Sequence, residues 1–160
     1  MNSKKLQTAI NTFVKNKKDN AAYYDENWAE RKERKSFYQE FAKDKLLAMS
    51  EEQFSEYISK LWSMLIWGNK QYVVEKIISD NGFDNVKKQL AELLYGFAPI
   101  EKRWDSFTKN VKGLGPATMS ELLTYVNPQE YVIFNKTTIL CYGYLDIPGM
   151  PKYNYQFTGK

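Results

Sequence analysis

The chemistry open to this chain is limited by the residue types that it lacks. Its 160 residues contain no histidine and a single cysteine, Cys141. Zinc sites built from Cys and His, and catalysis by Ser-His-Asp or Cys-His groups, are therefore excluded within one chain. Magnesium binding requires several carboxylates in one place, and the sequence holds no tight cluster of Asp and Glu. We predict no catalytic residue, no metal site and no cofactor.

One stretch, KGLGPATMSELL beginning at Lys112, has the composition of an anion-binding turn. Gly113 and Gly115 permit φ > 0 and close approach of another backbone, and Pro116 suits the first position of a helix. The N–H groups at that helix start would lie unpaired at the positive end of the helix dipole. Together with Lys112 and the Thr118 hydroxyl, they can bind a phosphate oxygen. A tight corner between two helices, with glycines that serve only packing, explains the spacing equally well.

Apolar residues recur at helical spacing along nearly the whole chain. A Ser50–Gln53 capping box marks one helix start, and Asn127 followed by Pro128 marks a helix end. The Val/Ile content of 72–78 is also compatible with a strand. The helical stripes cover 4–16, 28–46, 54–65, 72–78, 86–97, 100–111 and 119–126. These patterns predict an all-α, multi-helix globular fold.

The length is that of one domain spanning residues 1–160. From about residue 143 the sequence reads GYLDIPGMPKYNYQFTGK, an irregular tail with two prolines and no helical period. Its abrupt ending indicates a piece of a longer protein. No apolar stretch approaches the roughly 18 residues of a membrane span, and the N-terminus lacks the apolar core of a secretory signal. With its single cysteine, the chain is expected to be soluble and cytoplasmic, without a membrane partner.

The stretch VKGLGPATMSELL resembles the helix-hairpin-helix element of DNA repair glycosylases. The hairpin of that family has the pattern hydrophobic-x-Gly-hydrophobic-Gly, and its second helix begins Thr-Ala. The resemblance covers roughly residues 100–140 and implies a helix-hairpin-helix element at 100–126 that grips the phosphate backbone of double-stranded DNA. The DNA-binding residues that it implies at the hairpin are Lys112, Gly113, Leu114, Gly115, Pro116, Ala117 and Thr118.

Two positions depart from the catalytic pattern of that family. Its catalytic aspartate follows the first hairpin glycine by 22 positions, which is Asn135 here, and the nucleophilic lysine of its bifunctional members corresponds to Ala117. An amide cannot accept a proton at neutral pH, but it can hydrogen-bond a phosphate, a sugar or a base edge. The resemblance therefore implies DNA binding without catalysis, with Asn135, Lys136 and Thr137 as further contacts. Asn135 equally suits the N-cap of a helix formed by KTTILCYGYL.

A second resemblance concerns the setting of the domain. GLGPATMSELLTYVNPQEYVIFN, with LLYG upstream, is similar to an N-terminal module of bacterial restriction ATPases and related defence proteins. This likeness implies a target-recognition piece of a larger restriction or repair protein, whose remainder would be a partner. The 160 residues themselves hold no ATPase motif.

The basic residues are unevenly distributed. Residues 1–45 hold 11 Lys/Arg against 7 Asp/Glu, and the rest of the chain holds 12 of each. The densest segment, ERKERK at 30–35, fits a solvated helical face with i,i+3 and i,i+4 ion pairs. It also fits a patch that contacts phosphates. Both interpretations stay open at the level of sequence.

Aromatic residues near the hairpin and in the tail could stack on a flipped or single-stranded base. Trp104 and Phe107 are predicted to belong to the core, whereas the tail rings are candidates for the rim of a pocket. The tail rings are Tyr142, Tyr144, Tyr153, Tyr155 and Phe157.

Two functions of other classes remain open. An active glycosylase could use a displaced carboxylate, Asp105 or Glu121, although Glu121 is expected on the exposed surface. A helical protein-interaction domain with a degenerate hairpin would fit the balanced charge after residue 45.

Overall fold

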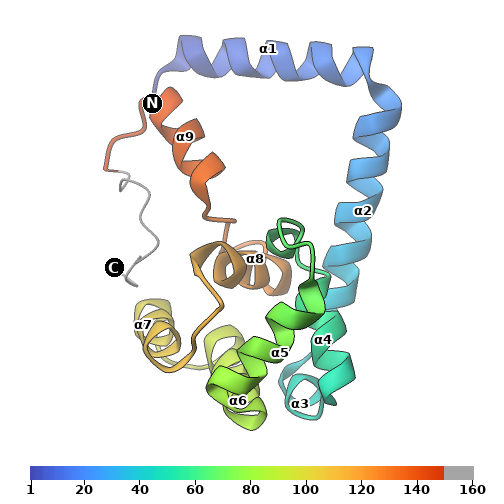
Figure 1. The fold of residues 1–160 in the computed structure, drawn as a ribbon. Helices are drawn as coiled ribbons and strands as arrows, with labels where there is room; N and C mark the ends of the chain where they lie inside the picture. Colours follow the sequence, from blue (N-terminus) through green and yellow to red (C-terminus); the bar gives the residue numbers. More distant parts are fainter. Residues whose placement is uncertain (150–160) are drawn as a thin grey trace.

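The computed structural model describes residues 1–149, which form nine α-helices and one short 3-10 helix and contain no strand (Figure 1). The predicted all-α fold class is confirmed. None of the helices in this part of the chain is long and apolar enough to cross a membrane. The elements are α1 (Ser3–Asp19), α2 (Ala21–Gln39), α3 (Lys43–Leu47), α4 (Glu51–Ser59), η1 (Trp62–Met64), α5 (Lys70–Asn81), α6 (Phe83–Tyr95), α7 (Ile100–Asn110), α8 (Pro116–Val126) and α9 (Lys136–Tyr144).

Helix α8 lies among the other helices and is largely enclosed by them (Figure 1). Eight of its eleven residues are buried, so that both its apolar and its polar faces meet other elements. Met119 and Leu122 are fully buried, and they join Phe54, Tyr57 and Leu90 in one hydrophobic core. Because such an interior is densely packed, α8 holds the segments that precede and follow it at fixed positions.

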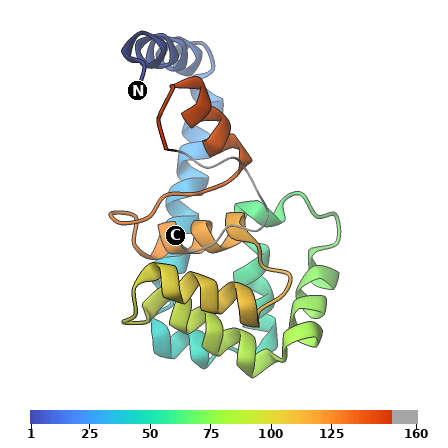
Figure 2. The ribbon, with the colours of Figure 1, turned by 90° about the vertical axis from the view of Figure 1, so that its left-hand side faces the viewer.

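Helices α1 and α9 stand apart from this core. α1 has no buried residue, and α2 buries only Tyr38 near its end. Figure 2 shows α1 and α9 on one side of the packed helices, with α2 leading from α1 down to them. Asn2 N donates to Leu145 O at 2.7 Å, and Lys5 Nζ lies 3.0 Å from the Asp146 carboxylate. Helix α1 therefore bridges α2 and the end of α9.

The apolar stripe predicted for 4–16 is present on α1, but the core does not cover it. Ile10, Phe13 and Val14 are each about half exposed. The Phe13 ring packs edge-on against the Tyr24 ring, with centroids 5.4 Å apart. The helix prediction is confirmed, and the stripe remains open to solvent.

The helix predicted over 28–46 is divided into α2 and α3. The Tyr95 hydroxyl donates to Phe41 O, which would accept from Lys45 N if the helix continued. Phe41 N instead bonds Tyr38 O, in the tighter turn that closes α2. A distant tyrosine therefore ends a helix that local periodicity would extend.

The stripe predicted over 54–65 also breaks, after Ser59. In a continuous helix Trp62 N would donate to Ile58 O, but both Trp62 N and Ser63 N donate to the Glu121 carboxylate, at 2.6 and 2.9 Å. Glu121 is only 2 % exposed. The expectation that Glu121 lies on the exposed surface is therefore wrong.

Several local signals are confirmed. Ser50 N donates to Gln53 Oε1 and Gln53 N donates to Ser50 Oγ, which completes the capping box. The segment 72–78 belongs to α5 and not to a strand, and α8 ends at Val126 with Asn127 as its C-cap. Trp104 and Phe107 are buried, as predicted.

The sequence predicts residues 143–145 both as the start of an irregular tail and as the end of a helix formed by KTTILCYGYL. Helix α9 continues through Tyr144, past the expected boundary at about 143, and the irregular part begins at Leu145. Tyr142 and Tyr144 are therefore residues of α9. Tyr153, Tyr155 and Phe157 lie outside the described residues.

Candidate nucleic-acid interface

The turn that joins α7 to α8, Val111–Gly115, buries its apolar residues and exposes its glycines. Val111 and Leu114 are each 4 % exposed, whereas Gly113 and Gly115 lie at the surface. Gly113 has φ +88°, and a Cβ built there would lie 3.0 Å from Ile77 Cγ1. A larger residue would therefore be strained in both conformation and space. This geometry explains why a glycine stands at 113.

Asn81, at the end of α5, clamps the turn. Its Oδ1 accepts from Lys112 N at 2.7 Å, and its Nδ2 donates to Lys112 O at 2.9 Å. Nδ2 also donates to Ile77 O of its own helix. The sequence alone gives no signal for this role of Asn81, because its partner Lys112 stands 31 residues away. The turn is consequently held in one conformation before any ligand arrives.

A set of backbone N–H groups at this turn has no acceptor among the described residues. Gly115 is the N-cap of α8 and offers no side-chain cap, and the first helix-type bond runs from Met119 N to Gly115 O. Such groups carry the positive end of the helix dipole and can bind an anion. The unpaired N–H groups are those of Gly113, Leu114, Gly115, Ala117 and Thr118.

The predicted residues around the turn differ in what they can offer. Lys112 is exposed and its side chain is available to an anion. The Thr118 side chain was expected to donate to a ligand, but it is 8 % exposed and its Oγ1 lies 3.1 Å from Ser63 Oγ. Pro116 is buried as well. Most of this region therefore presents backbone rather than side chains.

Asn135 is the N-cap of α9. Its Oδ1 accepts from Thr138 N at 3.0 Å, so the capping interpretation is confirmed. Just before it, Phe134 N donates to Ser120 Oγ at 2.9 Å, which fixes the start of α9 beside α8. Lys136 and Thr137 follow on the exposed first turn of α9. The amide of Asn135 thus has its oxygen engaged, while Nδ2 has no acceptor among the described residues.

A pocket of about 590 Å³ lies between α2 and the start of α9, and we call it the α2–α9 pocket. Asn135 and Thr137 line it from the α9 side. Arg31, Lys32 and Lys35 line it from α2. The structure therefore brings the basic segment of the sequence to two of the residues implied by the resemblance.

Three aromatic residues also line the α2–α9 pocket: Trp28, Trp62 and Tyr125. The Tyr125 ring stacks on Tyr38, with centroids 4.9 Å apart and planes at 7°. Burial, with a smaller effect of the Glu121 carboxylate, raises the pKa of Tyr125 to about 12, so its hydroxyl is protonated at neutral pH. The pocket thus combines cations with rings.

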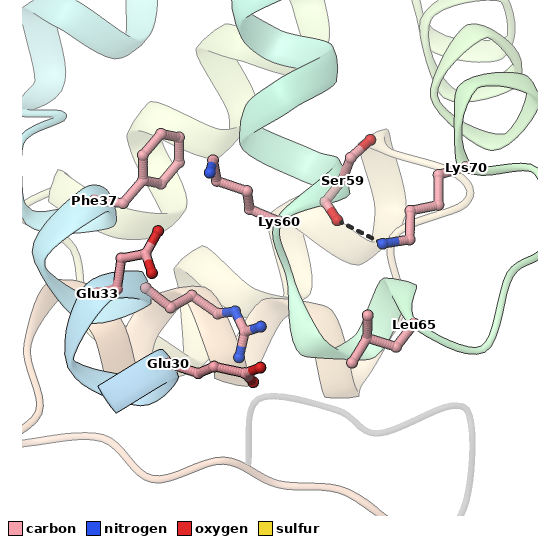
Figure 3. Close-up of a pocket in the computed structure, with 8 residues that line it drawn as sticks. Glu30, Glu33, Phe37, Ser59, Lys60, Leu65 and Lys70 are labelled. Atoms are coloured by element: carbon pink, nitrogen blue, oxygen red, sulfur yellow. Dashed lines mark hydrogen bonds between the residues drawn. The ribbon is translucent and has the colours of Figure 1, made fainter. Parts of the chain in front are cut away.

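A second, smaller pocket of about 310 Å³ lies on another face of α2 (Figure 3). Glu30 and Glu33 line it together with Lys60 and Lys70, so its charges are mixed. Lys70 Nζ donates to Ser59 O at 3.3 Å, as the dashed line in Figure 3 shows. The two carboxylates make this pocket less suited to a phosphate than the α2–α9 pocket.

No match to this chain was found among models of protein families, curated proteins or solved structures. The function must therefore be argued from the geometry of the turn and of the α2–α9 pocket. The resemblance of residues 100–140 to DNA repair glycosylases remains a prediction from the sequence.

Proposed function

We propose that this chain is a DNA-binding module without catalytic activity that holds the phosphate backbone of double-stranded DNA at the α7–α8 turn. The observation that carries the proposal is the row of backbone N–H groups before and at the start of α8 that have no acceptor in residues 1–149. Asn81 and the buried Leu114 hold these groups in place beforehand. A phosphate can then bind without the entropic cost of ordering the turn.

Two exposed lysines would add positive charge to this interface. Lys112 lies on the turn and Lys136 occupies the first position of α9, and both are exposed. The Ser120–Phe134 hydrogen bonds tie the start of α9 to α8, the helix that the turn precedes. Phosphate contacts from such lysines, together with backbone N–H groups, set the position of a protein on DNA without reading its sequence.

The proposal that this chain excises no base is supported by the groups at the positions that the resemblance aligns with the family's catalytic residues. Asn135 cannot act as a base, and Ala117 cannot act as a nucleophile. Glu121, a carboxylate that could have replaced them, is buried and accepts two backbone hydrogen bonds. These three features support binding without chemistry.

The setting that we propose is a larger bacterial restriction or repair protein, in which this module contacts the target. The open stripe of α1, with Ile10, Phe13 and Val14 half exposed, favours a protein contact on that side of the molecule. The same stripe supports the second candidate function, a helical protein-interaction domain.

A gel-shift titration with plain duplex DNA tests the proposal, and a base-release assay runs on the same samples with duplexes that carry uracil, alkylated or oxidised bases. We expect a shift that weakens with added salt and no released base. Absence of any shift at low salt would favour the protein-interaction domain. Release of a base that is lost on changing Asp105 or Glu121 would identify an enzyme.

A further inference from the structure

Helix α2 separates the charges of its ERKERK segment between two pockets. Glu30 and Glu33 line the smaller pocket shown in Figure 3. Arg31, Lys32 and Lys35 line the α2–α9 pocket, and no acidic residue lines that pocket among the described residues. An anion in the α2–α9 pocket would therefore meet three cations and no carboxylate on its walls. Among the described residues, the charged side chains that line this pocket are all positive.

Trp62, one of the aromatic residues of this pocket, is held in place by two charged side chains. The Glu121 carboxylate fixes the Trp62 backbone, and the Arg34 guanidinium lies 5.0 Å from the Trp62 ring centroid. Trp62 and Trp28 are nevertheless 42 % and 60 % exposed. Exposed indole rings beside cations are surfaces on which a flat heterocycle stacks.

The volume of the α2–α9 pocket and its polar side chains indicate the kind of ligand that fits it. The volume of about 590 Å³ falls within the range of about 300–1,000 Å³ that is typical of small-molecule sites. Asn135 Nδ2 and the Thr137 hydroxyl can donate hydrogen bonds at the walls, and Thr124 Oγ1, which donates to Ser120 O, can accept one. A ligand that uses all these groups has a flat base, polar edges and a negatively charged end.

We infer that the α2–α9 pocket binds a nucleoside monophosphate group, with its base against Trp28 and Trp62 and its phosphate at Arg31, Lys32 and Lys35. This group has two sources, a free mononucleotide and the unpaired 5′-phosphorylated end of a nucleic acid strand. The site uses none of the α7–α8 turn, so it does not depend on duplex binding there.

Calorimetric titration of the intact chain tests the ligand chemistry at low, fixed salt. The ligands are the four ribonucleoside 5′-monophosphates, adenosine and inorganic phosphate. At least one monophosphate is expected to bind saturably, with adenosine and phosphate each at least about tenfold weaker, because each lacks one half of the contacts. Inorganic phosphate that binds as tightly as every monophosphate would overturn the assignment of the base.

A second set of titrations decides whether the pocket binds a free mononucleotide or the 5′-phosphorylated end of a strand. A short single strand with a 5′-phosphate is compared with the same strand bearing a 5′-hydroxyl. Tighter binding of the phosphorylated strand than of the free monophosphate assigns the site to strand ends, and the reverse order assigns it to free nucleotides. No saturable binding of either the monophosphates or the phosphorylated strand would overturn the inference.

Matched variants separate this pocket from general attraction to a basic protein. The double variant Lys32→Ala/Lys35→Ala should weaken monophosphate binding by about tenfold or more. The control Lys15→Ala/Lys17→Ala removes the same charge from exposed positions of α1. It should change the affinity by less than about twofold. Trp28→Ala should weaken monophosphate binding by at least about fivefold. The control Trp67→Ala removes an exposed ring outside the pocket and should leave the affinity unchanged. Equal losses in variant and control would overturn the inference.

Discussion

Glu121 of α8 accepts a hydrogen bond from Trp62 N at 2.6 Å, across 59 positions of the sequence. Its second oxygen accepts from Ser63 N, so the carboxylate caps the η1 turn and ends the stripe that begins in α4. One buried side chain thereby sets the position of Trp62, a wall of the α2–α9 pocket. The same two bonds engage one of the two carboxylates, Asp105 and Glu121, that the sequence offers as a displaced catalytic acid.

Replacing this carboxylate should destabilise the fold. Glu121→Gln keeps the shape but offers one acceptor oxygen instead of two, and its amide N–H₂ faces a backbone N–H. We expect the free energy of unfolding in urea to fall by about 1–3 kcal/mol, the cost of leaving a buried donor unpaired. Glu130→Gln, at an exposed position, is the control and should change it by less than about 0.5 kcal/mol. Equal effects would show that the Glu121 bonds contribute nothing to stability.

The turn is tested by placing a negative charge where a phosphate should bind. Gly115 has φ −88° and ψ −179°, which any residue adopts, and a Cβ there has no atom within 4 Å. Gly115→Glu should therefore fold normally and weaken duplex binding by about 1–3 kcal/mol in a gel shift. Gly68→Glu makes the same change at another exposed glycine with open space around it. If both variants bind like the original chain, the turn is a packing corner only.

The salt dependence of DNA binding measures whether Lys112, on the turn, contacts a phosphate. Lys112 is clamped through its backbone by Asn81, so Lys112→Ala removes the charge without releasing the turn. The slope of log affinity against log salt should become less steep by about one, without a change in sequence preference. Lys15→Ala on α1 should leave the slope unchanged if that helix does not touch DNA. A slope near zero for the original chain contradicts phosphate binding altogether.

Asn135 is the position that the resemblance aligns with the catalytic aspartate of DNA repair glycosylases. Asp is as good an N-cap as Asn, so Asn135→Asp should keep the bond from Thr138 N and the stability of α9. We expect weaker duplex binding at low salt, because the new charge lies next to Lys136 and close to the bound phosphates, and no base release. Asn135→Ser retains a cap without a charge and is the control. Base release by the Asp variant would mean that the rest of a catalytic pocket is present.

Buried tyrosines predict a loss of stability at high pH. Burial raises the pKa of Tyr125 from 10.0 to about 12, and burial also raises the pKa values of Tyr38 and Tyr57. The unfolded chain releases these protons near pH 10 and the folded chain does not, so the contribution of these tyrosines to stability is constant below about pH 10 and is lost above it. Each tyrosine should contribute a loss of about 1.4 kcal/mol per pH unit there. Urea unfolding at about pH 9 and about pH 11 measures this. Because burial also raises the pKa of Tyr95, Tyr125→Phe should reduce the drop by roughly a quarter.

The sequence by itself determined the helical content and several helix ends. The Ser50–Gln53 box, the end of α8 at Asn127 and the Asn135 cap each depend on residues no more than four positions apart. Helical periodicity likewise repeats within one or two turns, so it is readable before the chain folds. The same short range explains the missed breaks after α2 and α4, because Tyr95 and Glu121 act from far along the chain.

Only the tertiary structure decided what the charged and polar residues do. From the sequence, the segment 30–35 could form ion pairs or a patch that contacts phosphates. In the fold, Glu30, Glu33 and Arg34 line the smaller pocket. Arg31, Lys32 and Lys35 line the α2–α9 pocket. Asn81 and Glu121 accept hydrogen bonds from Lys112 N and Trp62 N, two backbone groups that do not bond within a helix. The fold brings these distant groups to the two side chains. A polar side chain satisfies whichever buried partner the fold brings to it, and no local pattern encodes that partner.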